Sequence, residues 1–210
     1  QEDCKVYTTP HRKILRDALK ETGTITSAHF DFSQLSSKYP AFLRGEKPNI
    51  FNPSLATGCL MDLGVYCVYP AVDLFGIPDK INADAVFLNT GADGSGNASL
   101  NYSDKIVTLT YSKTGQDYVG SSVLGDKGTI VIESISKLIN GRLIDNDGNS
   151  RIIIPDMEKP VIMGYEALDF ENYIAGERLD EYRYAGDISL KVSQIMEIIR
   201  QKANIRFDIE

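Results

Sequence analysis

Residues 58–76 decide the fold, and they read GCLMDLGVYCVYPAVDLFG. In a helical projection, apolar side chains occur on every side of this stretch, which is typical of a helix buried within a protein. Pro70 predicts a kink or a local break within the helix, and Gly76 and Pro78 predict its end. The elements on either side of this buried helix therefore define the fold class.

Beyond the helix, the pattern changes to strands. Turn signals such as SKTGQ and GDKG divide residues 81–154 into short segments. Runs such as KIVTLTY (105–111) and TIVIES (129–134) are rich in β-branched residues. We expect strands near residues 81–90, 99–112, 117–124, 128–134, 137–145 and 150–154. Successive strands joined by short turns predict a mostly antiparallel meander.

The rest of the chain predicts further helices and one more strand. We expect a helix over 10–22, a strand over 26–32 and a long ordered loop over 33–57. At the other end, we expect helices over 165–175 and from about residue 187 onward. The order of helix, strand, helix, many strands and helices predicts an α+β fold, in which an open, mostly antiparallel β-sheet has helices packed on one face.

The composition excludes several classes of protein. The net charge of −7 repels a polyanion, so we expect no nucleic-acid partner. The most apolar stretch, residues 60–75, is too short and too often interrupted by polar residues to span a membrane. Three cysteines leave one unpaired in any disulfide scheme and lack metal-site spacing, so we expect a cytoplasmic protein without a metal site.

Asp62 and Tyr66 are the residues that suggest chemistry. They lie four positions apart on the buried helix, so their side chains share a face. A buried carboxylate is costly unless it is paired or hydrogen-bonded. The spacing alone is compatible with two interpretations: a helix-capping carboxylate beside a core tyrosine, or two functional groups in one site.

The same helix resembles the signature helix of the glucose–fructose oxidoreductase and inositol dehydrogenase family, called Gfo/Idh/MocA. In that family, a glycine-rich turn enters a helix that reads G-x-L-x-D-x-G-x-[HY]. The matching positions here are Gly58, Leu60, Asp62, Gly64 and Tyr66. Two weaker matches are GDKGTIVIE (125–133), similar to a family turn and strand, and an F-x-x-Y segment at residues 170–173 that precedes a closing helix.

The resemblance implies that a domain of this kind follows a Rossmann domain, which binds most of an NAD or NADP cofactor. A dinucleotide site needs a strand, a G-x-G-x-x-G turn and a helix. The cluster of Gly91, Gly94 and Gly96 lies between predicted strands and reads as a hairpin loop. We therefore expect residues 1–210 to form a single substrate-binding and dimerisation domain without cofactor-binding residues, and the Rossmann domain to lie outside this sequence.

The resemblance also implies a mechanism. Tyr66 stands where the family often has histidine, as in dihydrodiol and xylose-type dehydrogenases. A free tyrosine has a pKa of about 10, so a base near neutrality needs a nearby cation that favours the phenolate. Tyr66, assisted by the family's catalytic lysine, would take a hydroxyl proton while hydride passes to nicotinamide. Asp62 would hold either the substrate hydroxyl or that lysine.

The loop before the buried helix contains further polar candidates. Arg44, Asn49 and Asn52 are candidates for binding substrate hydroxyls, although they equally suit a solvated arginine and two turn formers. The triplet at residues 46–48 spells the E-K-P motif that supplies the catalytic lysine of the family. Because that motif belongs to the Rossmann half in the family, we expect Lys47 to be an exposed loop lysine.

Two functions follow from these observations. We expect the C-terminal domain of an NAD(P)-dependent oxidoreductase that acts on a sugar, polyol or diol. The alternative is a non-catalytic or regulatory homologue whose domain serves mainly for dimerisation. We also expect a homodimer through the open face of the sheet, because a contiguous apolar sheet face often marks an interface. The apolar residues expected to supply that face are some of Val107, Leu109, Tyr111, Ile130 and Ile132.

Overall fold

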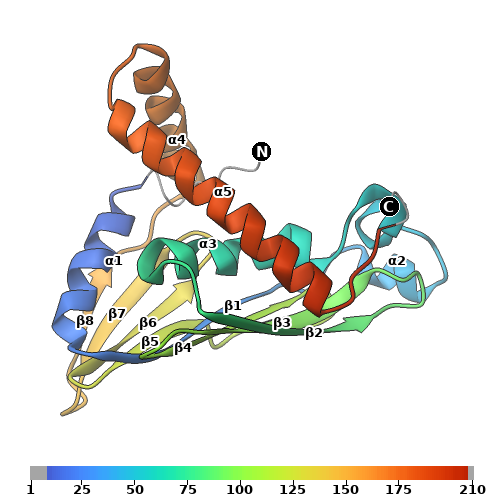
Figure 1. Cartoon of the computed structure of the whole chain (residues 1–210), viewed down its shortest axis with the longest axis horizontal. Coiled ribbons are helices and arrows are strands. Elements are labelled where there is room, and N and C mark those ends of the chain that lie inside the picture. The colour runs from blue at the N-terminus through green and yellow to red at the C-terminus, as the bar shows by residue number, and fades with distance from the viewer. Residues whose placement is uncertain (1–8, 208–210) are drawn as a thin grey trace.

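One eight-stranded sheet forms the body of the protein, as the computed structural model of residues 9–207 shows (Figure 1). Its strands are β1 (Ile25–Ser33), β2 (Lys80–Phe87), β3 (Asp93–Asn101), β4 (Ile106–Ser112), β5 (Ser121–Gly125), β6 (Gly128–Ser134), β7 (Ile139–Asp145) and β8 (Ser150–Ile154). Their order across the sheet is β2-β3-β4-β1-β5-β6-β7-β8. Every neighbouring pair is antiparallel except β1 and β4, which run parallel.

Helices cover one face of this sheet. The helices are α1 (His11–Leu19), α2 (Tyr39–Leu43), α3 (Val65–Phe75), α4 (Lys159–Ile174) and α5 (Leu179–Lys202). Shorter helical turns are η2 (Lys20–Thr22), η3 (Asn49–Phe51), η4 (Pro53–Leu55) and the π-helical turn η5 (Leu60–Gly64). Helices α1, α3 and α5 lie above the sheet, and its other face is open (Figure 1). The predicted α+β class with helices on one face is confirmed.

The core lies between the sheet and the helices, and it corrects one expectation. Val107, Leu109, Tyr111, Ile130 and Ile132 are all buried in the core, so none of them supplies the open face of the sheet. They occupy alternate positions of two strands, and the strand register places all of them on the helix-covered side. Their neighbours in sequence point to the open face, which is mostly polar there. Residues of the open face include Ser27, His29, Asn97, Ser99, Thr108, Thr110 and Ser122.

The strand boundaries differ most from the prediction between residues 91 and 112. The stretch 99–112, expected as one strand, is the end of β3 and the whole of β4, joined by a tight turn in which the Tyr102 N–H donates to the Lys105 carbonyl at 3.0 Å. Gly94 and Gly96, expected in a hairpin loop, belong to β3. A Cβ at residue 96 would lie 2.6 Å from the ring of Tyr111, so glycine is needed there to admit that ring.

The buried helix predicted over 58–76 is present, but its irregular turn lies ahead of Pro70. Residues 60–64 form the π-helical turn, and Pro70 lies within α3. A Cβ at Gly64 would lie 3.3 Å from the Tyr111 ring, so glycine lets this turn approach β4 closely. The helix therefore continues through Pro70 without the local break that was one of the two expectations, and the widened turn at its amino-terminal start carries Asp62.

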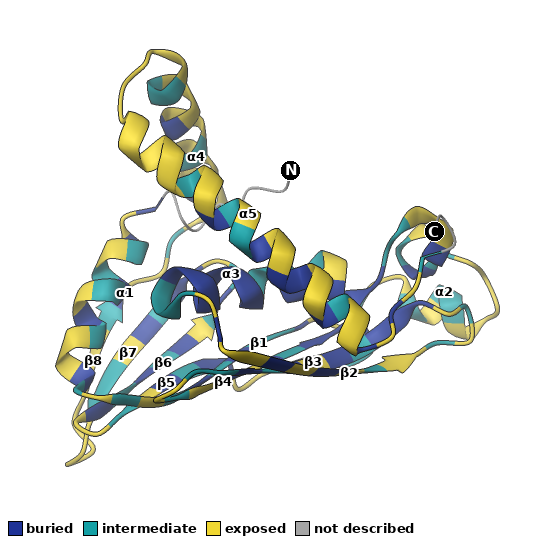
Figure 2. Cartoon of the chain, viewed as in Figure 1, coloured by how far each residue is buried: buried dark blue, intermediate teal, exposed yellow. Residues whose placement is uncertain are grey.

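The two last helices are longer than predicted. They begin at Lys159 and Leu179 instead of near residues 165 and 187. Helix α4 and the first turns of α5 project from the body as a hairpin whose surface is mostly exposed (Figures 1 and 2). The apolar residues of α4 are spread around the helix and form no stripe on one side. No amphipathic period therefore marks this hairpin in the sequence. Among residues 9–207, no helix is both long and apolar enough to cross a membrane.

Candidate functional site

Asp62 and Tyr66 lie above the carboxyl ends of the two parallel strands. Asp62, on the π-helical turn, forms an ion pair with Lys113, the residue that follows β4. Tyr66, in the first turn of α3, packs edge-on against Phe32 near the end of β1, with 5.3 Å between the ring centroids. The predicted pair therefore lies over the place where the carboxyl ends of the central strands β1 and β4 lie side by side.

Lys113 was not predicted as part of the site. Its side chain is only 5% exposed, and its Nζ donates to the Asp62 carboxylate and, at 3.3 Å, to the carbonyl of Ile50. The ammonium also lies 5.9 Å from the ring centroid of Phe51. A buried ammonium is stable only when such partners replace the water that it loses.

The Asp62 side chain is 37% exposed, far more than its lysine partner. Lys113 holds the Oδ2 oxygen, and within residues 9–207 the Oδ1 oxygen accepts no hydrogen bond. An ionised carboxylate is an acceptor only. Asp62 therefore presents an accessible acceptor that is fixed from below by a buried cation.

Asp93 on β3, and not Asp62, receives hydrogen bonds at the entrance of the helix. Its Oδ2 oxygen accepts from the backbone N–H of Leu60 at 2.7 Å and from the thiol of Cys59 at 3.1 Å. The residue is fully buried, and burial raises its pKa, although those two donors favour the charged form. A Cβ at Gly58 would lie 1.7 Å from the Oδ1 oxygen of Asp93. The first glycine of the signature is thus required by a buried carboxylate.

The asparagines of the preceding loop lie beside this pair. Ile50, whose carbonyl binds the buried lysine, stands between Asn49 and Asn52 in the loop. The Asn52 side chain accepts from the Ser54 N–H at 3.2 Å, and the Asn49 carbonyl accepts from the Thr57 hydroxyl at 2.7 Å. Asn52 is therefore a turn former, and the exposed side chain of Asn49 is the nearer candidate for a ligand contact.

Arg44 and Lys47 are surface residues of the same loop. The Arg44 guanidinium forms an ion pair with Glu46 at 2.7 Å, and both side chains are more than half exposed. Lys47 is exposed as well. Within residues 9–207, neither residue forms a hydrogen bond or an ion pair with Asp62.

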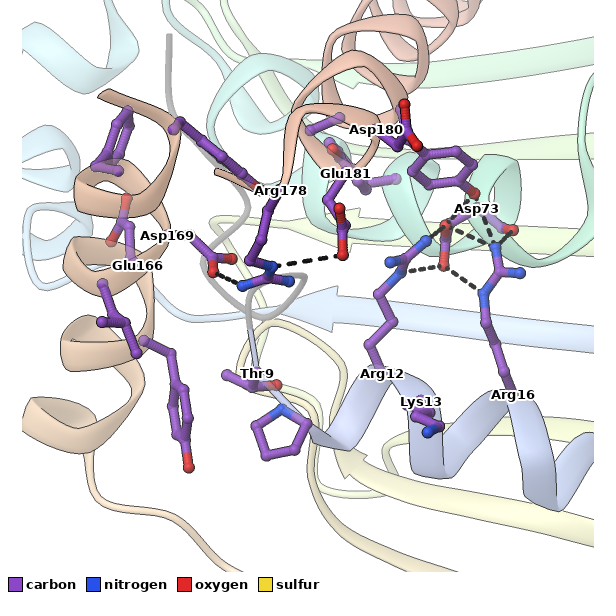
Figure 3. Close-up of a pocket in the computed structure, with 18 residues that line it drawn as sticks. Thr9, Arg12, Lys13, Arg16, Asp73, Glu166, Asp169, Arg178, Asp180 and Glu181 are labelled. Carbon is purple, nitrogen blue, oxygen red and sulfur yellow. Dashed lines mark hydrogen bonds and ion pairs between the residues drawn. The ribbon is translucent and has the colours of Figure 1, made fainter. Parts of the chain in front are cut away.

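A second polar cluster joins three helices near the carboxyl end of α3. The Asp73 carboxylate on α3 accepts hydrogen bonds from Arg12 and Arg16 of α1 at 2.7 and 2.8 Å, and from the Tyr184 hydroxyl of α5 at 2.7 Å (Figure 3). Burial alone would raise the pKa of Asp73, but these donors outweigh it and hold the pKa below its usual range. Both carboxylate oxygens are used, so this cluster ties the helices together.

The cluster forms one wall of a cavity of about 780 Å³ between α1, α3, α4 and α5. On the opposite wall, Arg178 forms ion pairs with Asp169 and Glu181 (Figure 3). The arginines that line the cavity, Arg12, Arg16 and Arg178, are thus paired with its buried acids Asp73 and Asp169. No unsatisfied buried group within the described chain points into this cavity.

Two residues of the site escaped prediction from the sequence. Lys113 lies in the segment SKTGQ and Asp93 in GADGSGN, and both segments carry turn signals. Asp93 and Lys113 lie far from residue 62 in the chain, and only the pairing of β3 with β4 brings them under the π-helical turn. One signal in the sequence pointed to Lys113. It directly follows a strand whose alternate residues are apolar, so its side chain continues the buried side of that strand.

Comparisons with known proteins identify the family. The model of the GFO/IDH/MocA C-terminal domain matches residues 15–131, so this chain belongs to that family. It is 37% identical over 205 residues to the scyllo-inositol 2-dehydrogenase (NADP(+)) IolU of Bacillus subtilis (strain 168), covering 97% of this chain and 62% of that protein. It is 39% identical over 136 residues to the uncharacterized oxidoreductase YgjR of Escherichia coli (strain K12), covering 65% of this chain and 42% of that protein.

Solved structures share the fold. An NAD binding oxidoreductase from Klebsiella pneumoniae superposes with a TM-score of 0.74 at 13% identity, covering 96% of this chain and 63% of that chain. This chain thus spans less than two thirds of the length of these similar proteins. The suspected family is confirmed, and the fold is the one found in its oxidoreductases.

Proposed function

We propose that this chain supplies the substrate-binding part of an NAD(P)-dependent oxidoreductase that acts on a hydroxyl of a sugar, polyol or diol. The observation that carries the proposal is the half-exposed Asp62 carboxylate, which is fixed by a buried lysine and lies four residues before Tyr66. The names of the similar proteins support oxidoreductase chemistry, and that of IolU supports a cyclic polyol and NADP.

The described residues do not suit the dinucleotide itself. The glycines of residues 91–96 lie at the β2–β3 turn and within β3, where Gly96 is covered by the ring of Tyr111. No glycine-rich turn within residues 9–207 connects a strand to a helix as a pyrophosphate site requires. NAD or NADP would thus be held mainly outside these residues. When bound, its nicotinamide supplies the acceptor for hydride.

The residues of this chain would bind and orient the substrate and move its proton. Asp62 accepts a hydrogen bond from a substrate hydroxyl through its Oδ1 oxygen, and the side chain of Asn49 contacts a further hydroxyl. As the phenolate, which the family's catalytic lysine outside these residues would favour, Tyr66 takes the proton from the reacting hydroxyl during oxidation, and as the phenol it returns a proton during reduction. In this proposal, Arg44 and Asn52 have no direct part, because one is paired on the surface and the other completes a turn.

The experiment is a steady-state assay of the full-length protein with NADP and NAD. The substrates would include scyllo-inositol, other inositols, monosaccharides and a dihydrodiol. Tyr66→Phe should lower kcat by roughly 10²–10⁴, the range for losing a general acid or base. Tyr118→Phe is the matched control, because Tyr118 is 92% exposed. A loss of less than threefold in Tyr66→Phe would remove Tyr66 from the mechanism.

A protein that oxidises none of these substrates, and binds neither cofactor, would favour the non-catalytic alternative. In that case, the Asp62 pair would serve only to stabilise the fold. Calorimetry with NADP separates this outcome from an untested substrate, because an active enzyme binds its cofactor without substrate. Micromolar binding of NADP by the full-length protein would keep the catalytic proposal.

We also propose a homodimer through the open face of the sheet and a cytoplasmic location. The open face is polar at its centre but carries exposed apolar residues on its outer strands and rim. Those residues include Val86, Ile106, Leu124 and Ile152. Light scattering should give a mass near two chains, and Thr110→Arg at the centre of the face should lower it.

The free thiols of Cys59 and Cys67 suit a reducing compartment, which supports the proposed cytoplasmic location.

A further inference from the structure

We propose that Lys113 is a positioning residue that holds the Asp62 carboxylate toward the substrate, an inference that rests on the proposed function. Its backbone is fixed on both sides. The Lys113 N–H donates to the Gly94 carbonyl at 2.8 Å, and its carbonyl accepts from the Ser36 N–H at 2.9 Å. The side chain therefore leaves a rigid point at the end of β4, on the same side of the sheet as Tyr111.

The side chain of Lys113 connects two separate segments of the site. Its Nζ binds Asp62 on the π-helical turn and the carbonyl of Ile50 in the preceding loop, and Phe51 packs against it. The Ile50 carbonyl and the Phe51 ring thus hold the ammonium in place beside Asp62.

Exposure separates the roles of the two partners. The lysine side chain is 5% exposed and the Asp62 side chain is 37% exposed, so a ligand reaches the carboxylate and not the ammonium. Lys113 thus acts through Asp62 and does not touch the substrate. It fixes the Oδ2 oxygen, which directs the Oδ1 oxygen outward to accept a hydrogen bond from a hydroxyl.

This arrangement predicts the effect of removing the ammonium. Without it, Asp62 rotates freely about its side-chain bonds, and the oxygen that holds the substrate loses its direction. A misplacement of about 1 Å in an active site costs roughly 10²-fold in rate. We therefore expect Lys113→Met to lower kcat/KM by about 10- to 100-fold. The fold should persist, because methionine fills the space of the lysine stem and Asp62 is exposed enough to be hydrated.

A double-mutant cycle in the full-length protein tests this inference. It compares Lys113→Met, Asp62→Asn and the double variant, with Lys47→Met as the control at an exposed lysine. If Lys113 acts through Asp62, the double variant should be no slower than Asp62→Asn alone. An independent structural role for Lys113 predicts that the two losses multiply. Thermal unfolding identifies the folded variants, and Lys113→Gln replaces Lys113→Met if the latter does not fold.

The outcomes separate the inference from the proposed function. If Asp62→Asn and Tyr66→Phe both retain full activity, the proposed function is wrong. If Asp62→Asn is slow while folded Lys113→Met and Lys113→Gln lose less than threefold, the positioning role is wrong. Losses that multiply in the double variant also overturn it. A double variant that matches Asp62→Asn, with a normal Lys47→Met control, supports it.

Discussion

Asp62 and Asp73 stand on the same buried helical segment, yet their surroundings are opposite. The Asp73 side chain is 1% exposed, and two arginines and a tyrosine use both of its oxygens. The Asp62 side chain is 37% exposed, and one lysine uses one of its oxygens. The two carboxylates therefore divide the helix into an end that joins α1 and α5 and an end that faces the candidate site.

The two carboxylates differ both in burial and in the number of satisfied oxygens, and together these properties separate a structural carboxylate from an available one. A saturated carboxylate has no acceptor left for a ligand. One that is fixed on a single side keeps a directed acceptor. Figure 3 shows the saturated case, in which Arg12 and Arg16 of α1 converge on Asp73.

The largest expected effect tests this division directly. Asp73→Asn removes the charge between two arginines, so we expect a loss of about 2–4 kcal/mol in the free energy of unfolding. That loss corresponds to a fall of roughly 5–15 °C in Tm. Asp62→Asn should cost less, about 1–2 kcal/mol, because Asp62 is partly hydrated and the amide oxygen can still accept from the buried ammonium, which loses its counter-charge. Activity should respond in the opposite order.

Thermal unfolding and kinetics of the two variants measure this contrast. Asp180→Asn is a suitable control, because Asp180 is 95% exposed beside the same cavity. If Asp62→Asn destabilised the protein as much as Asp73→Asn, both carboxylates would be structural.

A smaller effect is expected at the entrance of the helix. In Gly58→Ala, the new Cβ would lie 1.7 Å from the Asp93 carboxylate, which must move and weaken its bond to the Leu60 N–H. We expect a loss of about 1–3 kcal/mol in stability, together with reduced activity because Asp62 moves with this turn. Gly164→Ala has no atom within 4 Å of its new Cβ and should be neutral or slightly stabilising. Equal stability of the two variants would contradict this account.

The pH dependence of stability should distinguish two buried carboxylates by sign. The folded pKa of Asp73 is lowered, so its contribution is complete above the unfolded pKa of about 3.9 and is lost as the pH falls through the folded pKa. The folded pKa of Asp93 is raised, so its contribution is complete below the unfolded pKa and is lost as the pH rises through the folded value.

Urea unfolding at pH 3 and pH 7 measures this difference. The stability gap between wild type and Asp73→Asn should be wider at pH 7. The gap between wild type and Asp93→Asn should be wider at pH 3. These changes should be smaller than the full effect of Asp73→Asn, because protonated Asp73 can still accept the Tyr184 hydrogen bond. If the stability gap between wild type and each variant were the same at pH 3 and pH 7, neither carboxylate would have a shifted pKa.

The smallest effect is expected at Arg44. Its guanidinium is 65% exposed and pairs only with Glu46, so Arg44→Ala should change stability by less than about 0.5 kcal/mol. The value of kcat/KM should change by less than threefold. A tenfold rise in KM with an unchanged kcat would instead return Arg44 to the substrate-binding residues.

Much of the fold could be predicted, because its signals are local. The buried helix of residues 58–76, the β-branched runs and the turns between them depend on neighbouring residues. The open face of the sheet could not be predicted, because alternation shows that two faces exist but not which one the helices cover. The expectation that some of Val107, Leu109 and Ile130 lie on the open face failed for that reason.

The sequence by itself determined the family, the α+β class and the spacing of Asp62 and Tyr66. Only the tertiary structure decided which side chains surround that pair. The insertion of β1 between β4 and β5 places two parallel strand ends under the π-helical turn. Lys113 and Asp93 reach Asp62 and its helix through strand pairing over long sequence distances. Such contacts depend on the register of distant strands, which no local pattern of residues encodes.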